Sequence, residues 1–237
     1  MSTVAENRTD VRAAGVVVYS LLAAWLIVAL TMGTLGTYAP SSARPPVALG
    51  LSVGVPILLF AIAYCFEGPV RRVARYLDLR VIVLLHVGRL LAINFLLTAG
   101  EGRLPMGFAL PAGVGDIATA LFAIPIAYGI TAGLPSIRKW FIVWNLFGLA
   151  DLVNAVAQGI LHSSSTLGIL VGAGPTTYLM TQLPRSLVPT FLVPLYMMLH
   201  LLALARSGEV PVTASQREGE AAFPCGIFRS LARKPVI

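Results

Sequence analysis

Charged residues are scarce in this sequence, because only 11% of its 237 residues are Asp, Glu, Lys or Arg, whereas 57% are hydrophobic. Cysteine is scarcer still, and Cys65 and Cys225 cannot form a zinc cluster or a CxxC redox motif. The sequence also lacks a glycine-rich phosphate loop with its lysine and an HExxH zinc motif. These absences exclude nucleotide hydrolysis, thiol redox chemistry and zincin chemistry, and we expect no metal site.

Long apolar runs dominate the sequence instead. The mean hydropathy is +0.84, which lies outside the range of soluble globular domains. A helix needs about 20 apolar residues to cross a bilayer. The runs that meet this length are Ala13–Gly36, Val47–Phe66, Val81–Gly100, Ala109–Gly133, Phe141–His162 and Leu187–Ala205. The sequence therefore predicts an all-α fold, a polytopic integral membrane bundle of about six transmembrane helices.

The segments around these runs complete the expected organisation. Residues 1–12 are predicted to be a cytoplasmic N-terminal segment and residues 13–206 the transmembrane domain. Residues 207–237 are polar and rich in small residues, so we expect a disordered cytoplasmic tail. Residues 163–184 are apolar but are interrupted by three glycines and Pro175, which suits a re-entrant or interfacial segment better than a straight helix.

The net charge of +7 comes from basic residues that flank the apolar runs. If both termini are inside, thirteen cationic residues fall on the cytoplasmic side, with a dense group at 71–80, and three fall on the other side. This bias is the one that orients bacterial membrane proteins. We therefore expect the cell inner (plasma) membrane, both termini in the cytoplasm, and the lipid bilayer rather than nucleic acid as partner. Assembly as a homo-oligomer stays open.

One apolar run, Phe141–His162, carries four polar residues on one face. At about 100° per residue, Asp151, Asn154, Gln158 and His162 fall within about 80° of one another. Lipid would penalise such a face by several kcal/mol. We therefore expect this polar stripe to face the bundle interior, a cavity or a ligand, as the wall of a hydrated path.

Three ionisable groups lie at membrane depth. With a rise of about 1.5 Å per residue, Arg89 and Asp151 are about 13 and 15 Å from one boundary, and Asp116 is about 10 Å from the other. Arg89 can neutralise one carboxylate fully, so the second must be protonated, hold a cation or share a proton.

These residues predict a substrate- or proton-binding site made of Arg89, Asp116, Asp151, Asn154 and Gln158. The function that follows is transport of a small solute or ion, linked to a proton or another cation. An alternative is that Arg89 pairs with one aspartate only to lock helices together, while the other aspartate faces a water pocket.

His86 and His200 form a second candidate pair. Each lies six residues inside a basic residue at the cytoplasmic boundary, so both should be about 9 Å deep on different helices. Two such histidines could bind haem b axially in a membrane redox protein, with Arg89 available to a propionate. Ordinary hydrogen bonding between helices is the alternative role for this pair.

A short motif suggests a third reading. The segment Pro111–Asp116, PAGVGD, contains GxGD and resembles the intramembrane aspartyl proteases of the presenilin and signal-peptide-peptidase class. The resemblance covers four residues and implies peptide hydrolysis by two aspartates, with Asp151 as the second. In that family the second aspartate precedes GxGD, whereas Asp151 follows it, and the proline-alanine-leucine motif is not in a matching position. The sequence thus assigns no catalytic residue, and whether the protein is an enzyme stays open.

Overall fold

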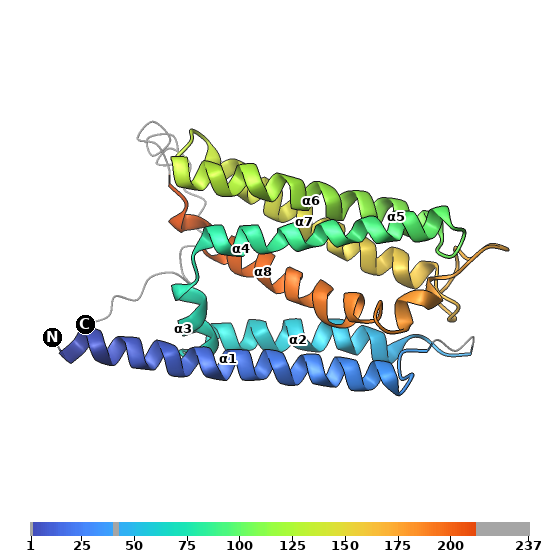
Figure 1. Ribbon diagram of the computed structural model, residues 1–237, viewed down its shortest axis with the longest axis horizontal. Helices are drawn as coiled ribbons and strands as arrows, with labels where there is room; N and C mark the ends of the chain where they lie inside the picture. The colour runs from blue at the N-terminus through green and yellow to red at the C-terminus, as the bar shows by residue number, and fades with distance from the viewer. Residues whose placement is uncertain (1, 40–42, 212–237) are drawn as a thin grey trace.

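The computed structural model describes residues 2–39 and 43–211, which contain helices and no strand (Figure 1). The elements in chain order are α1 (Ser2–Thr34), α2 (Val47–Cys65), α3 (Pro69–Tyr76), α4 (Leu79–Leu85), η1 (His86–Ala92), α5 (Ile93–Gly100), α6 (Met106–Ala132), α7 (Ile137–Leu161), η2 (Thr177–Thr181), η3 (Val188–Leu192), α8 (Val193–Ala205) and η4 (Ser207–Glu209).

Six helical stretches of the described chain are long and apolar enough to cross a membrane. They are Asp10–Thr34, Val47–Cys65, Leu79–Gly100, Met106–Ala132, Ile137–Leu161 and Val188–Ala205. The third consists of α4, η1 and α5, and the sixth of η3 and α8. The predicted six-helix membrane bundle is confirmed, and the protein is a multi-pass membrane protein.

Helical structure extends beyond the apolar runs at both ends of the transmembrane region. Helix α1 begins at Ser2 and runs through the expected N-terminal segment, because no glycine or proline interrupts the chain before Gly15. At the other end, η4 follows α8, and Val210 is only 2% exposed because it packs into the core. The first residues of the expected tail thus continue along the bundle, and its remainder from 212 to 237 lies outside the described residues.

The spanning helices fall into two groups with α8 between them (Figure 1). Helices α1 and α2 lie on one side, where α2 contacts α8 and α1 contacts the short helix α3. On the other side, α6 packs against α7 and against the whole α4–η1–α5 stretch. Both ends of the described chain lie at one end of the bundle, as an even number of crossings requires (Figure 1).

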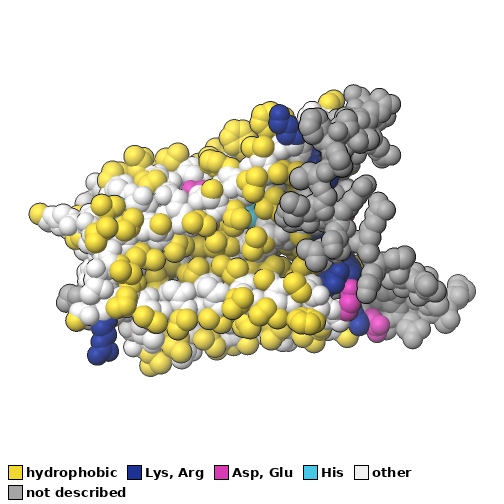
Figure 2. Space-filling model, turned by 180° about the vertical axis from the view of Figure 1, so that it is seen from behind, with side chains coloured by type: hydrophobic (Ala, Val, Ile, Leu, Met, Phe, Trp, Pro, Cys, Tyr) yellow, Lys and Arg dark blue, Asp and Glu magenta, His cyan; other side chains and the backbone are white. Residues whose placement is uncertain are grey.

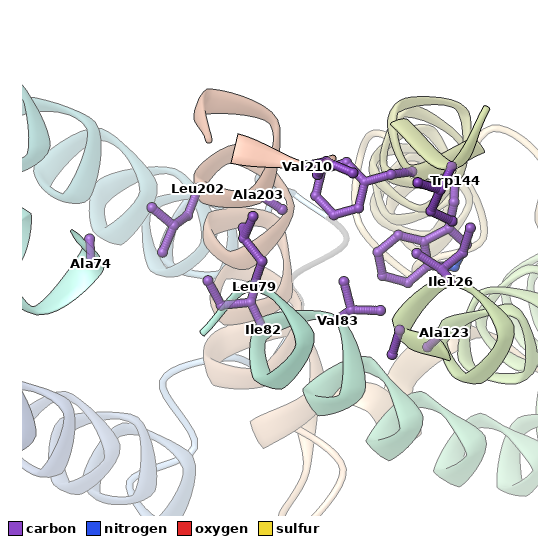
Figure 3. Packing of buried hydrophobic residues seen from close by; sticks show 13 residues of the cluster. Ala74, Leu79, Ile82, Val83, Ala123, Ile126, Trp144, Leu202, Ala203 and Val210 are labelled. Atoms are coloured by element: carbon purple, nitrogen blue, oxygen red, sulfur yellow. The ribbon is translucent and has the colours of Figure 1, made fainter. Parts of the chain in front are cut away.

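Two apolar clusters fill the bundle, one towards each end. The first, drawn in Figure 3, contains Ala74, Leu79, Ile82, Val83, Ala123, Ile126, Ala127, Ile137, Phe141, Trp144, Leu202, Ala203 and Val210. The second contains Ala92, Phe95, Ala99, Leu104, Phe108, Ala109, Ala112, Ala155 and Met180. The level between them, near the middle of α6, α7 and η1, is where Arg89, Asp116 and Asp151 are buried.

Residues 163–184 contain no α-helix and fold over the end of α7. The amide of Leu170 donates to the carbonyl of Leu161, and the amide of Thr177 donates to that of His162. The single short helix in this segment, η2, places Met180 in the second apolar cluster. The segment therefore forms a cap on this end of the bundle, as Figure 1 shows.

The outer surface matches a lipid environment. Hydrophobic side chains cover the visible face of the helices, and dark-blue basic side chains gather towards the ends (Figure 2). The sequence positions of the basic residues in the described chain place the group at 71–80, Arg138, Lys139 and Arg206 at one end, and Arg44, Arg103 and Arg185 at the other.

Candidate functional site

A short 3₁₀ stretch in the third span positions two side chains of the site. In the third span, the turn from His86 to Ala92 is a 3₁₀ helix, which has three residues per turn rather than 3.6. Residues three apart therefore lie above one another, and His86, Arg89 and Ala92 are the buried residues of this stretch. The 3₁₀ turn thus directs a histidine and an arginine to the same side, towards α6, α7 and α8.

Arg89 is the centre of the site and is only 3% exposed. Its Nε donates to Asp116 Oδ1 on α6 at 2.5 Å, and its Nη2 donates to Asp151 Oδ2 on α7 at 2.5 Å. Its Nη1 donates to the carbonyl of Gly148 at 3.4 Å and to His200 Nε2 on α8 at 3.1 Å. One side chain thus ties the third span to three other helices.

The charges of this cluster do not balance. Nε and Nη2 form one edge of a guanidinium, and that edge ordinarily binds both oxygens of a single carboxylate. Here Asp116 and Asp151 each supply one oxygen to it. With both carboxylates ionised, the cluster carries a net charge of −1 in a buried place, which favours the uptake of one proton or one cation.

Small residues allow the two aspartates to come this close. A Cβ on Gly115 of α6 would overlap the carboxylate of Asp151 on α7. A Cβ on Gly113 would meet the side chain of Leu96 at 3.0 Å. The two glycines of the PAGVGD segment therefore serve the close packing of α6 on α5 and α7.

The hydrogen bonds also fix the protonation of His200. Arg89 can only donate, so His200 Nε2 accepts and its Nδ1 carries the proton. That N–H donates to Asn145 Oδ1 at 3.0 Å, and Asn145 Nδ2 donates to the carbonyl of Phe141 at 2.8 Å. A continuous chain of polar contacts therefore runs from the two aspartates through Arg89 and His200 to α7.

The structure brings His86 and His200 together in a way that does not fit haem. Their ring centroids are 3.9 Å apart with an angle of 32° between the planes, so the rings stack on each other. Axial ligation needs two ring edges to approach an iron from opposite sides, with the flat macrocycle between the rings. Stacked rings leave no room for that group, so this arrangement of the two histidines does not fit axial ligation of haem.

His86 has an unusual environment of its own. It is 0% exposed, and neither ring nitrogen has a hydrogen-bond partner among the described residues. Its ring lies between aromatic neighbours, with centroids 5.2 Å from Trp144 and 5.3 Å from Tyr196. Within residues 2–39 and 43–211, no group of three or more His, Cys, Asp or Glu side chains could hold a metal ion.

The arrangement also differs from an aspartyl protease pair. Two catalytic aspartates share a proton and act together on a water molecule. Here both carboxylates bind the same guanidinium, and no hydrogen bond joins Asp116 to Asp151 directly in the described part of the chain. The GxGD resemblance therefore does not extend to the site.

A mostly apolar pocket leads to the cluster between α2, α5, α6, α7 and the η2–η3 region. Its volume is about 70 Å³, and Asp116 is the one charged residue among the described residues that line it. The residues of α7 that line it are Ala155, Val156, Gly159 and Ile160, and Ser163 follows just after the end of the helix. The pocket therefore runs beside the predicted polar stripe and not along it.

Asn154 and Gln158 are thus not joined to the cluster. Both are half-buried, and in the described structure their side chains make no hydrogen bond to Arg89 or the aspartates and do not line the pocket. Their predicted neighbour His162 lies against α6, where a Cβ on Gly107 would be 2.5 Å from its Nε2. The stripe faces the α6–α7 contact, and only Asp151 reaches the charged centre.

The last span is irregular next to the site. The amide of Val193 donates to the carbonyl of Val188, five residues earlier, so η3 is a π-helical turn. Pro194 has no N–H and would clash with the carbonyl four residues before it in a regular α-helix. The wider turn accommodates this proline and places Val188 and Val193 on the pocket wall.

Comparison with known proteins gives one match. No curated protein and no solved structure matches the chain. Residues 45–206 match a protein-family model described as Domain of unknown function (DUF8737). The matched region contains the five spans from α2 to α8 and every residue of the charged cluster, whereas α1 lies outside it. Because the match covers more than half of the chain, the protein belongs to this family, DUF8737.

Proposed function

We propose that the protein transports a small solute or ion across the membrane and that the transport is linked to a proton or another cation at the Arg89–Asp116–Asp151 cluster. The observation that carries this proposal is the excess of one carboxylate in a buried cluster held by one arginine. Burial makes an unbalanced charge costly, so the cluster favours a bound positive partner. A site that only locked helices together would need one aspartate.

Two further features support transport over a static role. The pocket gives a ligand a route to Asp116 from one end of the bundle. The 3₁₀ turn at Arg89 and the π turn before Val193 also interrupt two spans beside the pocket. Irregular helices next to buried charges are the usual construction of a transporter binding site, because they offer polar groups and places to bend.

We also propose that the protein lies in a cell inner membrane with both termini in the cytoplasm. The basic residues support this orientation, because the end that carries 71–80, Arg138, Lys139 and Arg206 is the more cationic end. Reporter fusions check it: green fluorescent protein at the C-terminus should fluoresce, whereas alkaline phosphatase inserted after Gly102 should be active. The opposite pair of results would reverse the orientation.

The test of transport uses the purified full-length protein in liposomes that contain the pH dye pyranine. A potassium gradient with valinomycin sets the membrane potential, and small cations, anions and neutral solutes are added outside in turn. We expect at least one solute to produce a protein-dependent change of internal pH. The Asp116→Asn and Asp151→Asn variants should abolish or uncouple this change, because each removes the excess charge.

The matched control is Glu101→Gln. Glu101 is exposed, pairs with Arg103 at the surface, and lies outside the cluster, so its loss should leave the flux unchanged. A solute-dependent proton flux that both aspartate variants retain at the wild-type level would contradict the proposal. If the wild-type protein takes up a solute without any movement of protons, the transport is not linked to a proton.

A further inference from the structure

The pocket beside Asp116 has the character of a small-ligand site. Its walls are largely apolar and include Phe95, Phe108, Met180 and Val193. One water needs at least about 10–15 Å³ of such a cavity, so about 70 Å³ accommodates roughly five atoms of that size. The occupant is therefore a small molecule with an apolar body.

Asp116 gives this mostly apolar site one charged anchor among the described residues that line it. Its Oδ1 binds Arg89, whereas its Oδ2 accepts no hydrogen bond from any residue in the described part of the chain. No lysine, arginine or histidine of the described residues lines the pocket. Asp116 therefore brings the excess negative charge of the cluster to the wall of the pocket.

We propose that the pocket binds a small organic cation, such as a protonated primary alkylamine of about five non-hydrogen atoms. This inference rests on the proposed transport function and names its substrate class. An ammonium group would donate to Asp116 and cancel the excess charge, and its alkyl chain would cover the apolar walls. The rings of Phe95 and Phe108 offer additional cation–π contacts near the walls.

Other ligand classes fit the site less well. An anion would meet an already negative cluster. A bare sodium or potassium ion needs several oxygen ligands to replace its water, and the mostly apolar lining supplies few. A neutral alcohol fills the volume but leaves the charge uncompensated, so its affinity should be lower.

The same charge count links the ligand to a proton. The cluster has one negative charge in excess, so a proton and an ammonium group compete for it. Binding of one favours release of the other, which is the requirement for exchange of an organic cation against a proton. The expected stoichiometry is one proton released for each ammonium bound.

The experiment measures binding by isothermal titration calorimetry with the full-length protein in lipid nanodiscs. The probes are butylammonium, butanol and butyrate, which have similar size but charges of different sign. We expect butylammonium to bind about tenfold or more tightly than butanol, and butyrate not to bind. In a weakly buffered solution with a pH dye, butylammonium should also release protons.

Two substitutions locate the binding. Asp116→Asn should weaken butylammonium binding about tenfold or more. Gly159→Ala keeps all charges and narrows the pocket, because its new Cβ would lie 3.6 Å from the ring of Phe108, an ordinary contact. It should weaken butylammonium about fivefold or more. Gly54→Ala is its matched control, since a Cβ there meets no atom within 4 Å and binding should not change.

The outcomes separate this inference from the proposed function. Equal binding of butylammonium and butanol, or full binding by both the Asp116 and Gly159 variants, would overturn the inference and indicate a neutral apolar occupant such as a lipid chain. If aspartate-dependent proton flux occurs with another solute while butylammonium does not bind, the inference fails and the transport function stands. If butylammonium binds as expected but no tested solute produces an aspartate-dependent proton flux in liposomes, transport fails and the binding site stands.

Discussion

Replacing the two buried aspartates separately and together tests the charge excess directly. In the structure both carboxylates bind Arg89, so removal of either still leaves the arginine with one counter-charge. Removal of both leaves a guanidinium that is 3% exposed without any carboxylate partner. We therefore expect Asp116→Asn and Asp151→Asn to be strongly non-additive in the free energy of unfolding.

The size of the effect follows from elementary electrostatics. Unit charges about 4 Å apart interact by about 4 kcal/mol at an effective dielectric constant of 20. Two attractions to Arg89 and one comparable repulsion between the carboxylates leave about 4 kcal/mol of net attraction, and one aspartate alone gives the same. Each single substitution should therefore cost less than about 1 kcal/mol, whereas the double substitution should cost about 4 kcal/mol.

Unfolding by SDS in mixed micelles, followed by circular dichroism, measures these free energies in a double-mutant cycle. The control cycle is Glu67→Gln with Glu101→Gln, because both are exposed carboxylates paired with surface arginines. That cycle should be additive, with changes of at most about 1 kcal/mol each. If the aspartate cycle is also additive, or if either single variant costs as much as the double, the excess-charge reasoning is refuted.

Two other predictions concern polar groups around the site and at the membrane boundary. Asn145→Ala leaves the His200 Nδ1–H without its acceptor and should cost about 1–3 kcal/mol of unfolding free energy in the same SDS assay, whereas Asn154→Ala should cost less than about 0.5 kcal/mol. At the start of α4, hydrogen bonds from Arg80 lower the pKa of Asp78 to about 2 from an ordinary 3.8. Its stabilisation is therefore complete above pH 3.8 and is lost as the pH falls through 2, so Asp78→Ala should cost about 0.5–1 kcal/mol in thermal unfolding at pH 7 and less near pH 2.

The sequence was informative about the helices because the membrane imposes a simple length rule. Apolar runs near 20 residues identified all six spans, and the glycine-interrupted stretch at 163–184 contains no spanning helix. The ends of the region were less predictable. Val210 follows a charged turn yet packs in the core, and only the fold shows that the first apolar cluster has space for it.

The site was partly predictable for a related reason. Charged residues are rare at membrane depth, so depth estimates alone suggested that Arg89 could reach Asp116 or Asp151, and the structure shows contacts to both. Depth does not define the direction of a side chain, however. Asn154 and Gln158 lie on the same face of α7 as Asp151. Beyond the aspartate, however, α6 packs against this face, as the approach of Gly107 to His162 shows.

Two residues of α7 that the sequence did not indicate, Asn145 and Gly148, also belong to the site. Asn145 lies about 120° from Asp151 on the helical wheel, outside the polar stripe, because it faces α8 and meets His200. Gly148 contributes a carbonyl, which no side-chain pattern can signal. The only sequence feature of position 148 is that it is a glycine, and the structure gives the reason: a Cβ there would overlap the ring of His200.

The irregular third span explains why one arginine serves so many partners. In a regular α-helix, positions 86 and 89 would be about 60° apart on the wheel, whereas three residues per turn place them directly above one another. Three residues per turn place both inward, so His86 stacks on His200 while Arg89 binds that same histidine and both aspartates. The 3₁₀ turn is therefore the element that lets one arginine of the third span reach side chains on three other helices.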